Sequence, residues 1–159
     1  MSLAMSRGSR SKCGSMAGKS GLASALAAAV MLSAPVMSAN AAPEASVDIE
    51  LNRLEQNGEA CRMTFVTRNG LSADLESSGF EMVVFDAKGL VKMMTVFDFG
   101  ALPAGKTVVR RFDLPDTGCE SVSRILVNGA ARCKGAGIEA ADCAKALKTK
   151  NLTDAEFGS

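Results

Sequence analysis

The chain has 159 residues, of which 47% are apolar and 22% are charged, and its formal net charge is +1. This length accommodates one globular domain, and the composition is too apolar for an intrinsically disordered chain. Histidine, tryptophan and tyrosine are absent from the sequence. The lack of histidine excludes His-based catalytic triads, His-ligated zinc sites and imidazole general bases.

The first 41 residues have the three parts of a secretory signal peptide. Four basic residues and no acidic one begin the segment, an apolar run follows over 21–32, and the small residues Ala39 and Ala41 precede Ala42. The apolar run is shorter than the roughly 20 residues of a membrane-spanning helix. We therefore predict a signal peptide over 1–41 and a periplasmic or secreted protein with no stable membrane span after cleavage. A retained membrane anchor is the alternative.

Removing this leader leaves 14 basic and 17 acidic residues, a net charge of −3. A negative balance does not favour a nucleic-acid partner. We predict that the four methionines that remain fill the core and do not bind a soft metal, since no histidine accompanies them; they are Met63, Met82, Met93 and Met94.

Four cysteines also remain after the leader: Cys61, Cys119, Cys133 and Cys143. An even number in a short exported chain predicts two disulfides formed in an oxidising compartment. A four-cysteine zinc site is the alternative, but the sequence lacks the close C-x-x-C pairs typical of structural zinc and of thioredoxin-like redox sites.

Apolar and polar residues alternate along most of the chain between 46 and 132, which predicts strands. Asn128-Gly129 is typical of a hairpin turn, and an Ala- and Lys-rich segment over 138–147 predicts a short helix. The expected strands cover 47–52, 61–69, 80–85, 90–99, 107–114 and 122–127, with a short seventh over 130–133. This spacing favours an antiparallel β-sandwich over 42–147, including the C-terminal helical segment, followed by a polar tail over 148–159.

Turn motifs within 61–114 carry a resemblance to a known fold. They are the Asn69-Gly70 pair, a Phe-Asp-x-x-Gly hairpin ending at Gly89, and Leu-Pro-Ala-Gly-Lys-Thr before a strand that ends in Phe-Asp-Leu-Pro at Pro115. This stretch resembles exported immunoglobulin-like domains, the FxLYD type among them, and small uncharacterised alphaproteobacterial exported proteins with similar cysteines. The resemblance implies an immunoglobulin-like sandwich and provides no catalytic residue to carry over.

In such a sandwich the second and sixth strands run in the same direction and face each other across the two sheets. Cys61 opens the expected second strand and Cys119 precedes the sixth. Of the three possible pairings we therefore predict Cys61–Cys119 with Cys133–Cys143, the second of which would hold the C-terminal segment against the last strand.

Residues 100–107 match the phosphate-binding pattern G-x-x-x-x-G-K-[ST]. That motif requires a helix after the loop, so that backbone N–H groups converge on the phosphates. Here the residues from Thr107 to Leu114 alternate as a strand does and are followed by Pro115. We therefore interpret this segment as a loop between strands and expect no cofactor.

Acidic and hydroxyl residues give no catalytic pattern. Asp48 and Glu50, and likewise Asp98 and Asp113, occupy positions expected to face solvent. Serine would need a lysine base in the absence of histidine, and S-x-x-K does not occur after the leader. We expect no catalytic residue and no enzyme.

Two surface features bear on whether the chain binds a partner. The third strand is apolar on both faces, with Val83 and Phe85 on the second face, so either the C-terminal segment with Ile138 and Leu147 or a partner must cover them; we prefer the former. Arg110 falls in the inward phase of its strand, which is typical of edge protection. The alternative is that Arg110 and Arg111 contact an acidic partner.

The sequence thus predicts a non-enzymatic binding or interaction module of the cell envelope, stabilised by disulfides, whose partner is an envelope protein. The alternatives are a carrier of a small apolar ligand between the sheets and an enzyme whose site does not use histidine. A carrier would show a sizeable interior cavity, and an enzyme would show clustered carboxylates with shifted pKa values.

Overall fold

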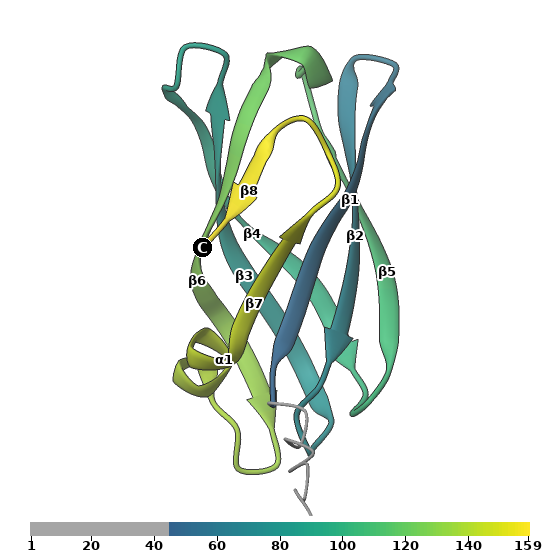
Figure 1. The fold of residues 1–159 in the computed structure, drawn as a ribbon, viewed down its shortest axis with the longest axis vertical. Coiled ribbons are helices and arrows are strands. Elements are labelled where there is room, and N and C mark those ends of the chain that lie inside the picture. Colours follow the sequence, from purple (N-terminus) through teal and green to yellow (C-terminus); the bar gives the residue numbers. More distant parts are fainter. Residues whose placement is uncertain (1–44) are drawn as a thin grey trace, which may run out of the picture. The chain divides into compact units, whose positions relative to one another are not determined.

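The structure is a computed structural model that describes residues 45–159 (Figure 1). The predicted signal peptide and its cleavage site before Ala42 lie outside these residues. The described chain forms eight strands, a 3₁₀ turn (η1) and a single α-helix. In chain order these elements are β1 Val47–Asn57, β2 Ala60–Asn69, β3 Leu75–Asp86, β4 Val91–Leu102, β5 Thr107–Leu114, η1 Cys119–Ser121, β6 Val122–Gly135, α1 Ala140–Ala146, β7 Leu147–Asn151 and β8 Glu156–Gly158.

The strands form two four-stranded sheets that pack face to face. Their orders are β5-β2-β1-β7 and β4-β3-β6-β8. Neighbouring strands are antiparallel except at one edge of each sheet, where β7 runs parallel to β1 and β8 runs parallel to β6. The predicted all-β sandwich with a short C-terminal helix is therefore confirmed.

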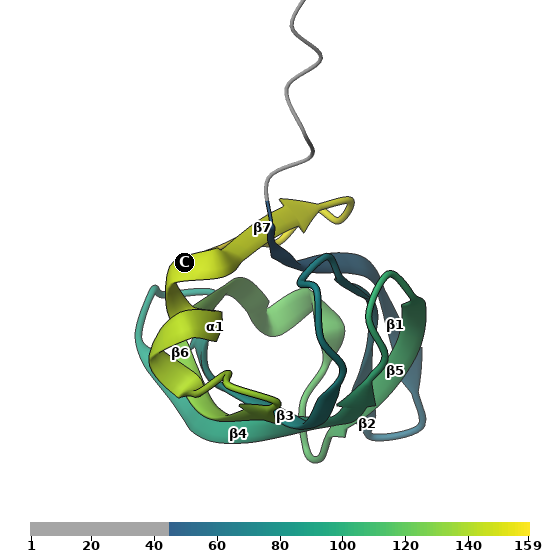
Figure 2. The same ribbon diagram turned by 90° about the horizontal axis from the view of Figure 1, so that it is seen from below.

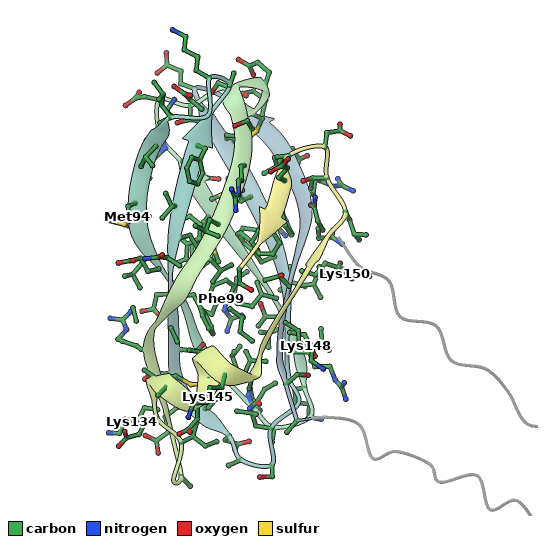
Figure 3. The ribbon with its side chains drawn as sticks, turned by 60° about the vertical axis from the view of Figure 1, so that its left-hand side comes forward. Met94, Phe99, Lys134, Lys145, Lys148 and Lys150 are labelled. Carbon is green, nitrogen blue, oxygen red and sulfur yellow. A yellow bond between two sulfur atoms is a disulfide. The ribbon has the colours of Figure 1, made fainter. Side chains whose placement is uncertain are left out.

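Alternation along the strands places one set of side chains between the sheets. In β1, for example, Val47, Ile49 and Leu51 are fully buried while the residues between them are partly exposed. Phe65 of β2 lies at the centre of the core, with ring centroids 5.7–6.0 Å from those of four other phenylalanines. One of these is Phe99 of β4, which points between the sheets (Figure 3).

The C-terminal residues differ from the prediction of a polar tail. Residues 147–151 form β7 on β1, and residues 156–158 form β8 on β6 (Figure 1). The sequence did not indicate these two strands, because few apolar side chains anchor the segment. Leu147 and Phe157 pack against the core and Ala155 is buried, while Lys150 forms an ion pair with Glu50 across the β1–β7 pair.

The helix lies where the sequence indicates, beside the end of β6 (Figure 2). It begins with a capping box in which Glu139 and Asp142 bond reciprocally to backbone N–H groups. Such a box satisfies donors that the first turn of a helix leaves free. The box fixes the start of a helix that is too short to be stable alone.

The predicted hairpin at Asn128-Gly129 is also wrong. A single strand, β6, runs through both residues and pairs with β3 on either side of them. The pairing register shifts at this point, because Met82 lies opposite Val127 while Glu81 lies opposite Gly129. Asn128 is thus the extra residue of a β-bulge, and its side chain bonds to Glu81.

Both predicted cysteine pairs form. Cys61 of β2 joins Cys119 of η1, with 4.8 Å between the Cα atoms, and Cys133 of β6 joins Cys143 of α1, with 6.3 Å. The first bond links the sheet that contains β2 to the segment that enters β6, and the second ties the helix to the other end of β6. All four thiols are used in these bonds, so the alternative of a four-cysteine zinc site is wrong.

Candidate interaction surfaces

Val83 and Phe85 lie on the outer face of β3, as the alternation predicts. Phe80, Met82 and Val84 belong to the core cluster between the sheets, whereas the side chain of Val83 is only 7% exposed but lies outside that cluster. The expected cover is wrong, because Ile138 and Leu147 pack against the inner core instead.

Residues of three adjacent strands make one apolar area around Val83, which we call the β4 patch. Val83 lies opposite Met94 of β4 and Leu126 of β6, and Phe85 lies opposite Val91. Three members, all from β4, are the most exposed. The side chains of Val91, Met94 and Val96 are 60%, 61% and 40% exposed, and Met94 projects away from the sandwich in Figure 3. The β4 patch comprises Val83, Phe85, Val91, Met94, Val96 and Leu126.

Three of the four methionines pack in or against the core, as predicted, and one does not. Met63 and Met82 are fully buried and Met93 packs partly against the core. Met94 is exposed on the β4 patch, so the prediction is wrong for this residue. Met94 belongs to the surface because the chain places Met93, its neighbour, on the inner face.

Polar pairs border the β4 patch. The guanidinium of Arg124 lies 5.5 Å from the ring centroid of Phe85 and 3.9 Å from a carboxylate oxygen of Glu156. On another side, Arg132 forms a 2.7 Å ion pair with Asp98. An apolar centre with a polar, charged rim is the arrangement typical of a protein–protein interface.

Arg110 and Arg111 lie away from this patch and away from each other. The Nε group of Arg110 donates a 2.8 Å hydrogen bond to the backbone carbonyl of Phe99. β5 and β4 are edge strands of the two sheets, and this bond joins them. Arg110 therefore covers part of the β4 edge, which is what edge protection requires. Arg111 is exposed and lies opposite Thr64 on the outer face of the other sheet. The structure does not bring the two arginines and the β4 patch into one surface.

The segment that matches the phosphate-binding pattern is the connection from β4 to β5. A strand begins at Thr107, at the position where the motif requires a helix. Backbone groups of the loop are bonded to β2, since Gly105 N–H donates to the carbonyl of Asn69 and Asn69 N–H donates to the carbonyl of Lys106. The loop therefore crosses between the sheets as the sequence indicates.

The carboxylates with shifted pKa values lie in ion pairs between neighbouring strands. The Lys150 ammonium, 2.7 Å away, and the Asn52 amide lower the pKa of Glu50 below its ordinary value. Arg62 bonds both carboxylate oxygens of Asp113, at 2.8 and 2.9 Å, and lowers the pKa of Asp113. Both shifts follow from pairs that hold strands together. Within residues 45–159, no three metal-ligating side chains cluster and no helix is long and apolar enough to span a bilayer.

The Glu50–Lys150 pair predicts a measurable pH dependence. Because the pKa of Glu50 is lower in the folded chain than in the unfolded chain, its stabilisation is complete above the unfolded value and is lost as the pH falls through the folded pKa. We expect Glu50→Gln to lower the free energy of unfolding by about 0.2–1 kcal/mol at pH 7 and to have little effect at pH 2. Urea denaturation at the two pH values measures this. An equal loss at both would contradict the account.

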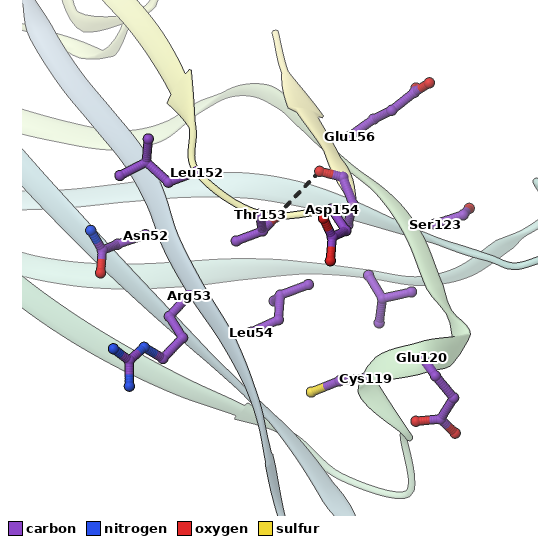
Figure 4. Close-up of a pocket in the computed structure, with 12 residues that line it drawn as sticks. Asn52, Arg53, Leu54, Cys119, Glu120, Ser123, Leu152, Thr153, Asp154 and Glu156 are labelled. Atoms are coloured by element: carbon purple, nitrogen blue, oxygen red, sulfur yellow. Dashed lines mark hydrogen bonds between the residues drawn. The ribbon is translucent and has the colours of Figure 1, made fainter.

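An open cleft of about 830 Å³ lies where β7 ends and β8 begins (Figure 4). One wall is β1 at Asn52, Arg53 and Leu54, and the opposite wall is η1 and the start of β6. The turn from β7 to β8 closes one end. The residues of this opposite wall are Cys119, Glu120, Val122 and Ser123. The residues of the closed end are Leu152, Thr153, Asp154, Ala155 and Glu156. We call this space the β1–β6 cleft.

The chain is similar to the solved structure of IrmA from Escherichia coli. The two share 12% sequence identity with a TM-score of 0.54, over 68% of this chain and 93% of that chain. At this identity the likeness supports the β-sandwich fold alone. No protein-family model matches the sequence, and no curated protein matches it. The resemblance to FxLYD-type domains therefore stays a prediction.

Proposed function

We propose that the protein is a non-enzymatic interaction module of the cell envelope that binds another envelope protein through the β4 patch. The observation that carries this proposal is the exposure of Val91, Met94 and Val96 on one strand beside Val83 and Phe85. Clustered apolar exposure of this kind is costly in water unless a partner covers it. Arg124, Arg132 and Asp98 at the rim provide polar groups that orient a partner.

Export to the periplasm or the extracellular space is the second part of the proposal. The leader over 1–41 supports it, and the two disulfides are of the kind that persist in oxidising compartments. The alternative of an apolar ligand between the sheets has less support, because the rings around Phe65 fill that space.

Co-purification from the native envelope tests the binding surface. We expect Met94→Lys to abolish recovery of the partner, because a buried ammonium would face an apolar contact. Val109→Lys is the matched control, since Val109 is 52% exposed on the edge strand β5 of the other sheet. Recovery of the same partner with both variants, or its loss with both, would contradict the proposal.

A further inference from the structure

The β1–β6 cleft exists because the C-terminal strands are shorter than the strands they join. β7 pairs with β1 only from Val47 to Leu51, although β1 continues to Asn57. β8 pairs with β6 from Arg124 to Leu126, although β6 begins at Val122. Beyond Leu51, no strand of residues 45–159 lies along this side of β1.

A side-chain-capped turn ends β7 at this point. The side chain of Asn151 donates to the carbonyl of Ala155 at 2.7 Å and accepts from the N–H of Thr153 at 3.0 Å. The N–H of Leu152 still donates to the carbonyl of Leu51 at 2.9 Å. The chain then turns away to β8, so the next position along β1 is left open.

The backbone of β1 presents hydrogen-bonding groups to this open position. Asn57 and Ala60 pair across a two-residue hairpin, which points their N–H and C=O groups at each other. Alternation from Asn57 turns the backbone groups of Gln56 and Leu54 to the opposite side of β1, and Leu54 lines the cleft. The extra residue at the bulge, Asn52, shifts the alternation by one position. The carbonyl of Leu51, which accepts from the N–H of Leu152, therefore points to the same side as the backbone groups of Leu54.

The cleft has an apolar floor and acidic sides. Val122 and Ala155 are buried and Leu54 packs partly against the core, while Leu152 is 54% exposed at the rim. Glu120 and Asp154 are the acidic residues that line the space beside Glu156 (Figure 4). Neither takes part in an ion pair within residues 45–159. Arg53 also lines the cleft; it is exposed and, by alternation, its side chain leaves β1 on the face opposite Leu54.

We infer that the β1–β6 cleft binds an extended peptide segment that adds to β1 in line with β7. Main-chain hydrogen bonds to Leu54 provide the pairing, as in other cases of strand addition. Alternate side chains of the segment are apolar, facing Leu54 and Val122, and cationic, facing Glu120 and Asp154. This site is separate from the β4 patch. If the cleft binds no peptide, the proposed function of the β4 patch is unaffected.

Two heptapeptides test the site on the purified protein with both disulfides oxidised. One alternates lysine with valine, and the other alternates glutamate with valine. We expect saturable binding of the lysine peptide by fluorescence anisotropy and none of the glutamate peptide. Asp154→Lys and Glu120→Lys should each weaken binding by about fivefold or more, whereas Glu76→Lys, an exposed carboxylate of β3 outside the cleft, should leave it unchanged.

Amide hydrogen exchange distinguishes strand addition from simple charge attraction. Bound peptide should slow exchange at the N–H of Leu54 by about tenfold or more, because a hydrogen bond to the peptide replaces one to water. Lack of saturable binding would overturn the inference. So would binding that Asp154→Lys leaves intact, or binding that leaves the Leu54 amide unprotected.

Discussion

Replacing Cys61 and Cys119 together by alanine is expected to lower the free energy of unfolding by about 4 kcal/mol. The bond closes a separation of 58 residues, and the chain-entropy model assigns a loop of this length about that value. The loss is a large fraction of the 5–15 kcal/mol that is typical of a folded domain. Urea denaturation of the oxidised protein and of the double variant measures it.

The second disulfide provides the matched comparison. Cys133–Cys143 closes only ten residues, for which the same model gives about 2.7 kcal/mol. The double alanine variant at these positions should therefore be less destabilised than the first. A larger loss from Cys133 and Cys143 than from Cys61 and Cys119 would contradict the account.

Phe65→Ala is expected to destabilise the fold by about 3–5 kcal/mol, which is the usual range for a fully buried phenylalanine. The Phe65 side chain is 0% exposed and its ring lies within 6.0 Å of the rings of Phe97, Phe99, Phe112 and Phe157. Removal of the ring leaves a cavity that both sheets line.

Phe85→Ala is the control for this effect. Phe85 lies on the outer face of β3 and is partly exposed, so the substitution should cost much less. Thermal or urea unfolding of both variants decides between them. A similar loss of stability from the two substitutions would show that Phe65 is not the centre of the core.

Much of the fold could be predicted because local alternation and burial agree. Val47, Ile49 and Leu51 alternate with polar residues, and these three side chains are the buried ones. The pairing of Cys61 with Cys119 followed from the direction of the second and sixth strands and from their facing each other in an immunoglobulin-like sandwich. What the sequence did not indicate depends on contacts between distant segments. Leu147 is the only apolar side chain of β7, and the strand forms because the edge of β1 accepts it.

The interaction surfaces were only partly predictable for a similar reason. Val83 and Phe85 could be identified because β3 is apolar in both phases. In β4, however, Met93 and Met94 are adjacent and equally apolar, so the sequence alone did not indicate which one faces the core. The β1–β6 cleft depends on where β7 ends, and the Asn151 turn that ends it lies in a segment expected to be a polar tail.

Site-specific photo-crosslinking in intact cells tests the central claim that the β4 patch is the binding surface. A photoreactive residue is placed at position 94 and, separately, at position 109 of the full chain. We expect one discrete adduct with an envelope protein from position 94 and none from position 109. Lack of an adduct at position 94, or the same adduct from both positions, would contradict it.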